Sequence, residues 1–109
     1  MLKKEYSMTE GLYQKIKGSP SIEIEISEQL RSRIDEFTSH LLKSNFPYDT
    51  LCWALAELQL IFEKGHKNYS ESEVIEREKK IFDSTLNYEE ICWFIGSLKA
   101  YLEENRMYP

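Results

Sequence analysis

Apolar residues recur at helical spacing over most of this chain. In its first half they are separated by four, three and four residues, which places them on one face of a helix over residues 27–43. Ser27 has the side chain of an N-cap, and Glu28 brings a favourable negative charge to the first turn. The residues on this face are Leu30, Ile34, Phe37 and Leu41. The pattern predicts an amphipathic surface helix.

A second helix is predicted over residues 48–64. Pro47 suits the first turn of a helix, and Gly65 suits its end. Between Leu51 and Phe62 only Glu57 and Gln59 are polar. Because a helix that is apolar nearly all round must be buried, we expect this helix to supply much of the core.

Two further helices follow. Ser70 and Glu73 have capping-box spacing for a third helix that ends near Phe82, and Asn87 with Glu90 marks the start of a fourth over residues 88–104. The apolar residues of the third helix are few, and they are Val74, Ile75, Ile81 and Phe82. We therefore expect the third helix to be the most exposed of the four.

The second and fourth helices are copies of one another, offset by forty positions. The identical pairs are Tyr48/Tyr88, Cys52/Cys92, Trp53/Trp93, Leu58/Leu98 and Glu63/Glu103. All cysteine and tryptophan residues of the chain lie in these two copies. We expect the indoles and thiols of both copies to be buried in a shared interior.

These patterns predict a mainly α single domain over residues 1–109. It would be a four-helix bundle made of two tandem helical hairpins of about forty residues, 27–65 and 70–105, because short connections make neighbouring helices antiparallel. Two arrangements remain open. The Cys-Trp helices can face each other across a pseudo-twofold axis, or the repeats can stack like a solenoid fragment that a second copy completes.

The segment over residues 1–26 has a different pattern. Three isoleucines alternate with Glu23 and Glu25, which is the period of a half-buried strand. These isoleucines are Ile22, Ile24 and Ile26. A strand needs a hydrogen-bonding partner, which residues 11–17 can supply as a β-hairpin, unless another subunit or a bound protein does so. Residues 8–17 also fit a short helix, and the sequence leaves helix or strand open.

Composition and charge narrow the classes of function. The 109 residues carry a net charge of −5 and two cysteines. No apolar run follows Lys3 and Lys4, and no stretch approaches 18 apolar residues, so we predict a cytoplasmic chain without a membrane span. The acidic balance disfavours direct binding of nucleic acid and favours a basic protein partner.

No cofactor or metal is expected. The candidate ligands Cys52, Cys92, His40 and His66 lack C-x-x-C spacing, and both cysteines sit on apolar helices, where a free thiol packs as a small hydrophobe. The chain has no glycine-rich phosphate loop, G-x-S-x-G or H-E-x-x-H motif. These features favour a protein that is not an enzyme.

One pair of residues resembles a known catalytic motif. Arg33 and His40 have six residues between them, and this spacing is similar to the R-x(4–6)-H motif of HEPN-type ribonucleases, which are small helical bundles. The resemblance implies a third hypothesis, a helical ribonuclease. The family motif lies on a late helix with a polar residue after the arginine, whereas here it lies on the first long helix and Ile34 follows.

The leading hypothesis is a small acidic protein that binds and inhibits a basic protein, such as an immunity protein or antitoxin that neutralises a toxin nuclease. The alternative is a self-associating, homodimeric regulatory or structural module. Acidic residues beside a tyrosine on the thin third helix are the candidate contact surface. The predicted contact residues are Tyr69, Glu71, Glu73, Glu76 and Glu78.

Overall fold

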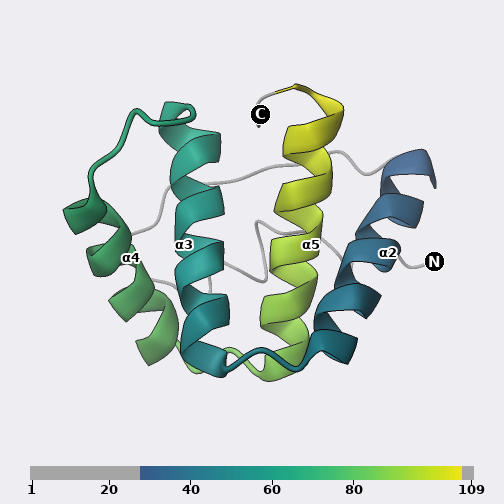
Figure 1. Ribbon diagram of the computed structural model, residues 1–109, viewed down its shortest axis with the longest axis horizontal. Helices are drawn as coiled ribbons and strands as arrows, with labels where there is room; N and C mark the ends of the chain where they lie inside the picture. Colours follow the sequence, from purple (N-terminus) through teal and green to yellow (C-terminus); the bar gives the residue numbers. More distant parts are fainter. Residues whose placement is uncertain (1–27, 107–109) are drawn as a thin grey trace.

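The computed structural model describes residues 28–106, and within this range the chain forms four helices and no strand (Figure 1). Helix α2 spans Glu28–Ser44, α3 spans Tyr48–Lys64, α4 spans Glu71–Asp83 and α5 spans Tyr88–Glu104. The mainly α prediction and all four predicted helices are confirmed. The strand predicted at residues 22–26 and the cap predicted at Ser27 lie outside the described residues.

Local capping chemistry explains where the helices begin and end. The Ser70 hydroxyl accepts from the Glu73 amide at 3.2 Å, while the Glu73 carboxylate accepts from the Ser70 amide at 2.9 Å. Asn87 and Glu90 form the same reciprocal pair, so both predicted capping boxes are present. Helix α3 starts directly after Pro47 and ends at Gly65, whose φ of 95° is the kind that glycine adopts without strain.

The helices lie in the order α4, α3, α5, α2 across the molecule (Figure 1). The two copied helices, α3 and α5, run parallel and contact each other in the middle. Helix α4 packs on α3, and α2 packs on α5. Neither α2 with α3 nor α4 with α5 is among the extensive contacts of the described residues.

This pairing corrects the predicted helical hairpins. The first helix of each repeat packs on the second helix of the other repeat, and not on the second helix of its own repeat. The connectors still reverse the chain direction, as expected. Those between α2 and α3 and between α4 and α5 lead across the molecule, whereas the connector between α3 and α4 joins two helices that lie side by side (Figure 1). If the two repeats are exchanged, α3 takes the place of α5 and α4 takes the place of α2, so the α3–α4 contact becomes the α5–α2 contact. This equivalence is the signature of a pseudo-twofold relation. The predicted facing of the Cys-Trp helices is confirmed.

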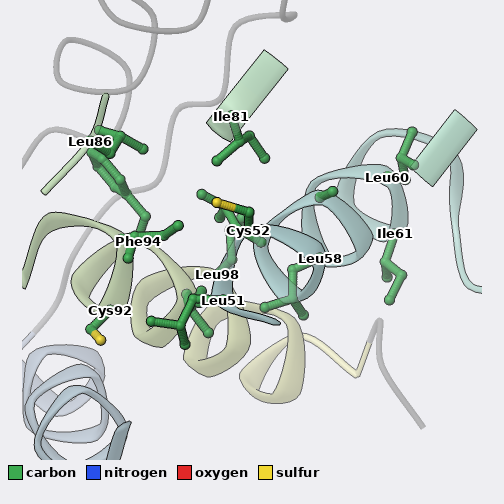
Figure 2. Close-up of a cluster of buried hydrophobic side chains, with 14 of the residues drawn as sticks. Leu51, Cys52, Leu58, Leu60, Ile61, Ile81, Leu86, Cys92, Phe94 and Leu98 are labelled. Carbon is green, nitrogen blue, oxygen red and sulfur yellow. The ribbon is translucent and has the colours of Figure 1, made fainter. Parts of the chain in front are cut away.

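The core lies between these helices, and Figure 2 shows part of it. Cys52 and Cys92 are 0 % exposed and unpaired, so the prediction that both thiols pack in the core is confirmed. The prediction that both indoles are buried is wrong, because Trp53 and Trp93 are only half-buried and pack against the edge of the cluster. An indole is large enough to cover a core with one face and keep the other in water.

Two tyrosines tie the halves together at one end of the bundle. The Tyr48 hydroxyl, at the start of α3, donates to the Leu86 carbonyl in the α4–α5 connector at 2.5 Å. The Tyr88 hydroxyl, at the start of α5, donates to the Phe46 carbonyl in the α2–α3 connector at 2.6 Å. Donors and acceptors are each offset by forty positions, so the two bonds are copies. We call this pair of bonds the tyrosine clasp.

The backbone of the connectors is copied as well. Asn45 and Thr85, the residues that follow α2 and α4 at equivalent positions, have φ values of 56° and 61°. This left-handed conformation is uncommon for any residue other than glycine and costs a β-branched threonine more than it costs asparagine. Its presence in both connectors shows that the turn shape is repeated while the residue type is not. Across residues 28–106 none of the helices has the length and apolar character needed to cross a bilayer.

Candidate functional site

The acidic residues predicted as one contact surface lie on two flanks of α4. Residues 73, 76 and 80 follow one side of the helix, and residues 71, 75, 78 and 82 follow the other, each set at spacings of three and four. Val74 and Ile81 are the buried residues between them. The structure therefore brings Glu73 and Glu76 to one flank and places Glu71 and Glu78 on the other.

The flank with Glu73 is occupied by internal contacts. Besides its capping box with Ser70, the Glu73 carboxylate forms an ion pair with Lys64 at the end of α3. The Lys64 hydrogen bond and then the Ser70 amide lower the pKa of Glu73. Glu76 is exposed and lines a hollow of about 110 Å³ together with the basic residues Lys64, Arg77 and Lys80. Since lysine and arginine offset these acids, this flank offers a basic partner little net charge.

The opposite flank combines acids with exposed apolar side chains. Ile75 is 46 % exposed and Phe82 is 51 % exposed, although both were predicted to face the core. Glu71 and Glu78 alternate with them at spacings of four, three and four residues. Neither acid takes part in an ion pair among residues 28–106. We call Glu71, Ile75, Glu78 and Phe82 the α4 stripe.

Tyr69 is less exposed than a contact residue on an open surface would be. Its side chain is half-buried and packs against the main core cluster in the loop before α4. A ring held in this way supports the start of α4. It is not the freely exposed tyrosine that the sequence pattern suggested.

Buried polar contacts hold α4 against α3. The Arg77 guanidinium binds the Glu63 carboxylate through two bonds of 2.7 and 2.9 Å and also donates to the Gln59 side-chain carbonyl at 3.0 Å. The paired side chains of Arg77 and Glu63 are only 14 % and 11 % exposed. A bidentate pair of this kind fixes orientation as well as distance, so α4 presents its stripe from a rigid position.

Aromatic and thiol groups pack next to the stripe. Phe82 makes an edge-on contact with the Tyr48 ring, with centroids 5.5 Å apart. Burial, followed by the charge of Glu78, raises the pKa of the Cys52 thiol to about 11. Burial also raises the pKa of Cys92. Neutral thiols of this kind are poor nucleophiles, because the thiolate is the reactive form.

A second feature, which the sequence pattern missed, is a groove between α2 and α3. Its volume is about 320 Å³ and its floor is formed by α5. Its walls are mainly apolar, with Phe37 and Leu41 from α2 and Leu58 and Ile61 from α3. The remaining lining residues are His40, Phe46, Ala54, Glu57, Ile95 and Lys99.

Repeat counterparts of the groove residues fill the corresponding place in the other half. Leu86, the counterpart of Phe46, is 3 % exposed, and Phe94, the counterpart of Ala54, is 6 % exposed. Both point into the core cluster (Figure 2). Phe46 is 42 % exposed and Ala54 leaves room where Phe94 has a ring. The signal for the groove was thus present in the repeat alignment, as a small residue opposite a large one.

The residues considered for catalysis and metal binding lie as follows. Arg33 bonds to Glu103 of α5 at 3.0 Å, with its guanidinium 5.2 Å from the Phe37 ring centroid. His40 is exposed at the groove. Among residues 28–106, no three His, Cys, Asp or Glu side chains gather in a way that would hold a metal ion. The ribonuclease hypothesis stays a prediction.

Comparisons with protein-family models, with curated proteins and with solved structures give no match to this chain.

Proposed function

We propose that this protein is a non-enzymatic inhibitor that binds a basic protein, such as a toxin nuclease, through the α4 stripe. The observation that supports the proposal most is the alternation of exposed apolar and unpaired acidic side chains along one side of a rigid helix. Protein interfaces combine a few apolar or aromatic anchors with a polar surround, and the stripe has this composition.

Charge supports a basic partner. The chain carries −5 overall, and the two stripe acids lack internal cations among the described residues. Complementary charge accelerates encounter and selects against acidic partners, while apolar anchors slow dissociation. The proposal includes the predicted cytoplasmic location. The two unpaired cysteines fit this location, because a reducing compartment keeps thiols free.

The α2 helix provides a matched comparison. Position 35 of α2 is the counterpart of position 75 and holds Asp35 instead of an apolar residue. The Ile75→Asp variant therefore gives α4 the side chain that its copy tolerates at an exposed position. Asp35→Asn and Leu42→Ser change exposed residues of α2 and serve as controls.

The test begins with co-purification of the full chain from its native cell, comparing wild type with Ile75→Asp. For a protein recovered only with wild type, we expect Ile75→Asp to weaken the measured affinity at least about tenfold, or roughly 1.4 kcal/mol. We expect Glu71→Gln combined with Glu78→Gln to slow association and to reduce its dependence on salt. The α2 controls should bind as wild type does.

Three results would oppose the proposal. The first is a partner with an acidic surface, and the second is a partner whose affinity is lowered by the α2 variants and not by Ile75→Asp. The third is a partner whose enzymatic activity continues when the chain is bound. A stable symmetric dimer in sedimentation at micromolar concentration would instead support the self-associating module, and RNA cleavage lost in His40→Ala would support the ribonuclease.

A further inference from the structure

Phe82, in the last turn of α4, is the most exposed large apolar side chain among residues 28–106. Its ring meets the Tyr48 ring of α3 edge-on, with centroids 5.5 Å apart and an angle of 69° between the two rings. An edge-on contact covers at most one face of a ring. Because Phe82 is also 51 % exposed, it presents an aromatic face to solvent.

The carboxylate of Glu78 lies at the same part of the α3–α4 contact. Glu78 precedes Phe82 by one helical turn, so both side chains lie on one side of α4. Burial, and then the charge of Glu78, raise the pKa of the Cys52 thiol, and Cys52 lies one turn after Tyr48 on α3. Glu78 is half-buried and forms no ion pair within residues 28–106. An open ring and a carboxylate without an internal cation therefore lie side by side.

The charged side chains around this position are mainly acidic. Besides Glu78 they are Asp49 at the start of α3, Asp83 at the end of α4 and Glu90 at the start of α5. Arg77, the residue before Glu78, is bound to Glu63. Lys79, the residue after it, lies about 100° further round the helix. The end of α4 and the start of α3 meet here, so their helix dipoles oppose each other and the side chains make the position negative.

The molecule contains one example of a cation that binds a ring and a carboxylate together. The Arg33 guanidinium of α2 lies 5.2 Å from the centre of the Phe37 ring and also bonds to the Glu103 carboxylate at 3.0 Å. A guanidinium group is planar, so it can stack on a ring with its face while its edge donates to a carboxylate. The ammonium group of lysine is a point charge and lacks this geometry.

We propose that Phe82 and Glu78 form a site for an arginine side chain of the basic partner, with the guanidinium stacked on the Phe82 ring and paired with the Glu78 carboxylate. This inference rests on the proposed function, because it names the residue type that anchors the partner to the α4 stripe. The other repeat holds Thr38 and Leu42 at the equivalent positions, which offer neither a carboxylate nor a ring.

A nuclear magnetic resonance titration of the full chain tests the site without the partner. The probe is N-acetyl-arginine amide, and the matched control is N-acetyl-citrulline amide, which has a similar shape and no charge. At constant ionic strength, we expect the arginine probe to shift the backbone amide signals of residues 78 and 82 more than those of residues 38 and 42. The citrulline probe should show no such difference, and N-acetyl-lysine amide should show a smaller one.

Two substitutions separate the ring from the charge. Phe82→Leu gives α4 the residue that its copy has at position 42, and Glu78→Gln keeps the length of the side chain while removing its charge. Each variant should lower the initial slope of shift against concentration of the arginine probe at least about threefold, because each removes one of the two interactions. Leu42→Ser changes the equivalent exposed position of α2 and should leave the slope as in wild type.

Equal shifts from the arginine and citrulline probes would overturn the site. Equal shifts from the arginine and lysine probes, or an unchanged slope in either variant, would overturn it as well. If the arginine probe binds here but no basic protein depends on Ile75, the proposed function fails and the arginine site remains. If a basic protein depends on Ile75 but arginine and citrulline shift the signals equally, the proposed function remains and the arginine site fails.

Discussion

The α3–α4 contact and the α5–α2 contact are copies that do the same task with different side chains. Glu63 and Glu103 are equivalent, and each pairs with an arginine from the outer helix of the other repeat. The Glu63 pair with Arg77 is buried and bidentate. The Glu103 pair with Arg33 has one bond of 3.0 Å, and its side chains are 32 % and 49 % exposed.

The two contacts also differ at other equivalent positions. In the α3–α4 contact, Gln59 is fully buried and accepts from Arg77, whereas its counterpart Lys99 lies at the surface beside the Phe37 ring. In the α5–α2 contact the backbones approach closely at Gly96, whose counterpart in the other half is the buried Ala56. One contact is held by a polar network and the other by close packing.

This comparison shows which residues the duplication constrains. The identical tyrosines form the clasp, the identical glutamates anchor the outer helices, and the identical cysteines fill the core. Residues that match between the copies therefore hold the halves together. The α4 stripe and the groove lie where the copies differ, at Ile75 opposite Asp35 and at Ala54 opposite Phe94.

The largest expected difference between the two contacts is in the free energy of unfolding that is lost when the arginine is removed. Arg77→Ala leaves Glu63 and Gln59 buried without their cation, and breaking a buried pair costs about 3 kcal/mol. Arg33→Ala breaks an exposed pair and should cost less than about 1 kcal/mol. Urea unfolding of both variants measures this. Equal losses would show that the two contacts do not differ as described.

Stability should decrease at high pH because of the buried thiols. The pKa of Cys52 is raised from 9.0 to about 11, so between these values the unfolded chain loses its proton while the folded chain keeps it. The stability present below pH 9 is then lost as the pH rises through 11, on the order of 2 kcal/mol. Urea midpoints at pH 8, 10 and 11 test this, with Cys52→Ala as the control that should show a flatter profile. A profile equally steep in Cys52→Ala would assign the loss to other groups.

Gly96→Ala should destabilise the fold by about 1 kcal/mol although alanine favours helices. A Cβ at this position would lie 2.5 Å from the Thr38 hydroxyl oxygen and 3.2 Å from the Ile34 carbonyl oxygen and the Thr38 nitrogen. Threonine can rotate, but the two backbone atoms yield only if α2 moves away. Thermal unfolding measures the change. A stabilised Gly96→Ala protein would mean that α2 does not approach α5 this closely.

The two bonds of the tyrosine clasp should show the smallest difference in their contribution to the free energy of unfolding. Tyr48→Phe removes a partly buried bond and leaves the Leu86 carbonyl without its donor, at a cost of about 1 kcal/mol. Tyr88→Phe removes an exposed bond that water can replace, so it should cost less. A double-mutant cycle on urea unfolding also reports whether the two bonds are coupled. A larger loss for Tyr88→Phe would contradict the assigned burial.

The sequence predicted those parts of the fold that local chemistry determines. Helix ends followed from Pro47, Gly65 and the two capping boxes, because each acts within one turn. Helix pairing did not follow, since periodicity shows which face of a helix is apolar and not which helix covers it. Short connectors suggested hairpins, but they allow crossed pairing equally well when two copies can exchange partners.

The candidate site was predicted only in part, for a similar reason. The sequence identified α4 as the exposed acidic helix, but it could not separate Glu73, which caps α4 and pairs with Lys64, from Glu71 and Glu78. Ile75 and Phe82 read as core residues because apolar side chains usually are. Their exposure depends on the rotation of α4 about its axis, which the buried Arg77 contact determines.

The crossed pairing of the repeats is tested most directly by proton distances between α2 and α5. Crossed pairing predicts strong nuclear Overhauser effects from the Gly96 α-protons to protons of Thr38 and Ile34, because the backbones of α5 and α2 meet there. If these effects are absent and a continuous series of such effects links α2 to α3 instead, each repeat packs on itself and the crossed pairing is wrong.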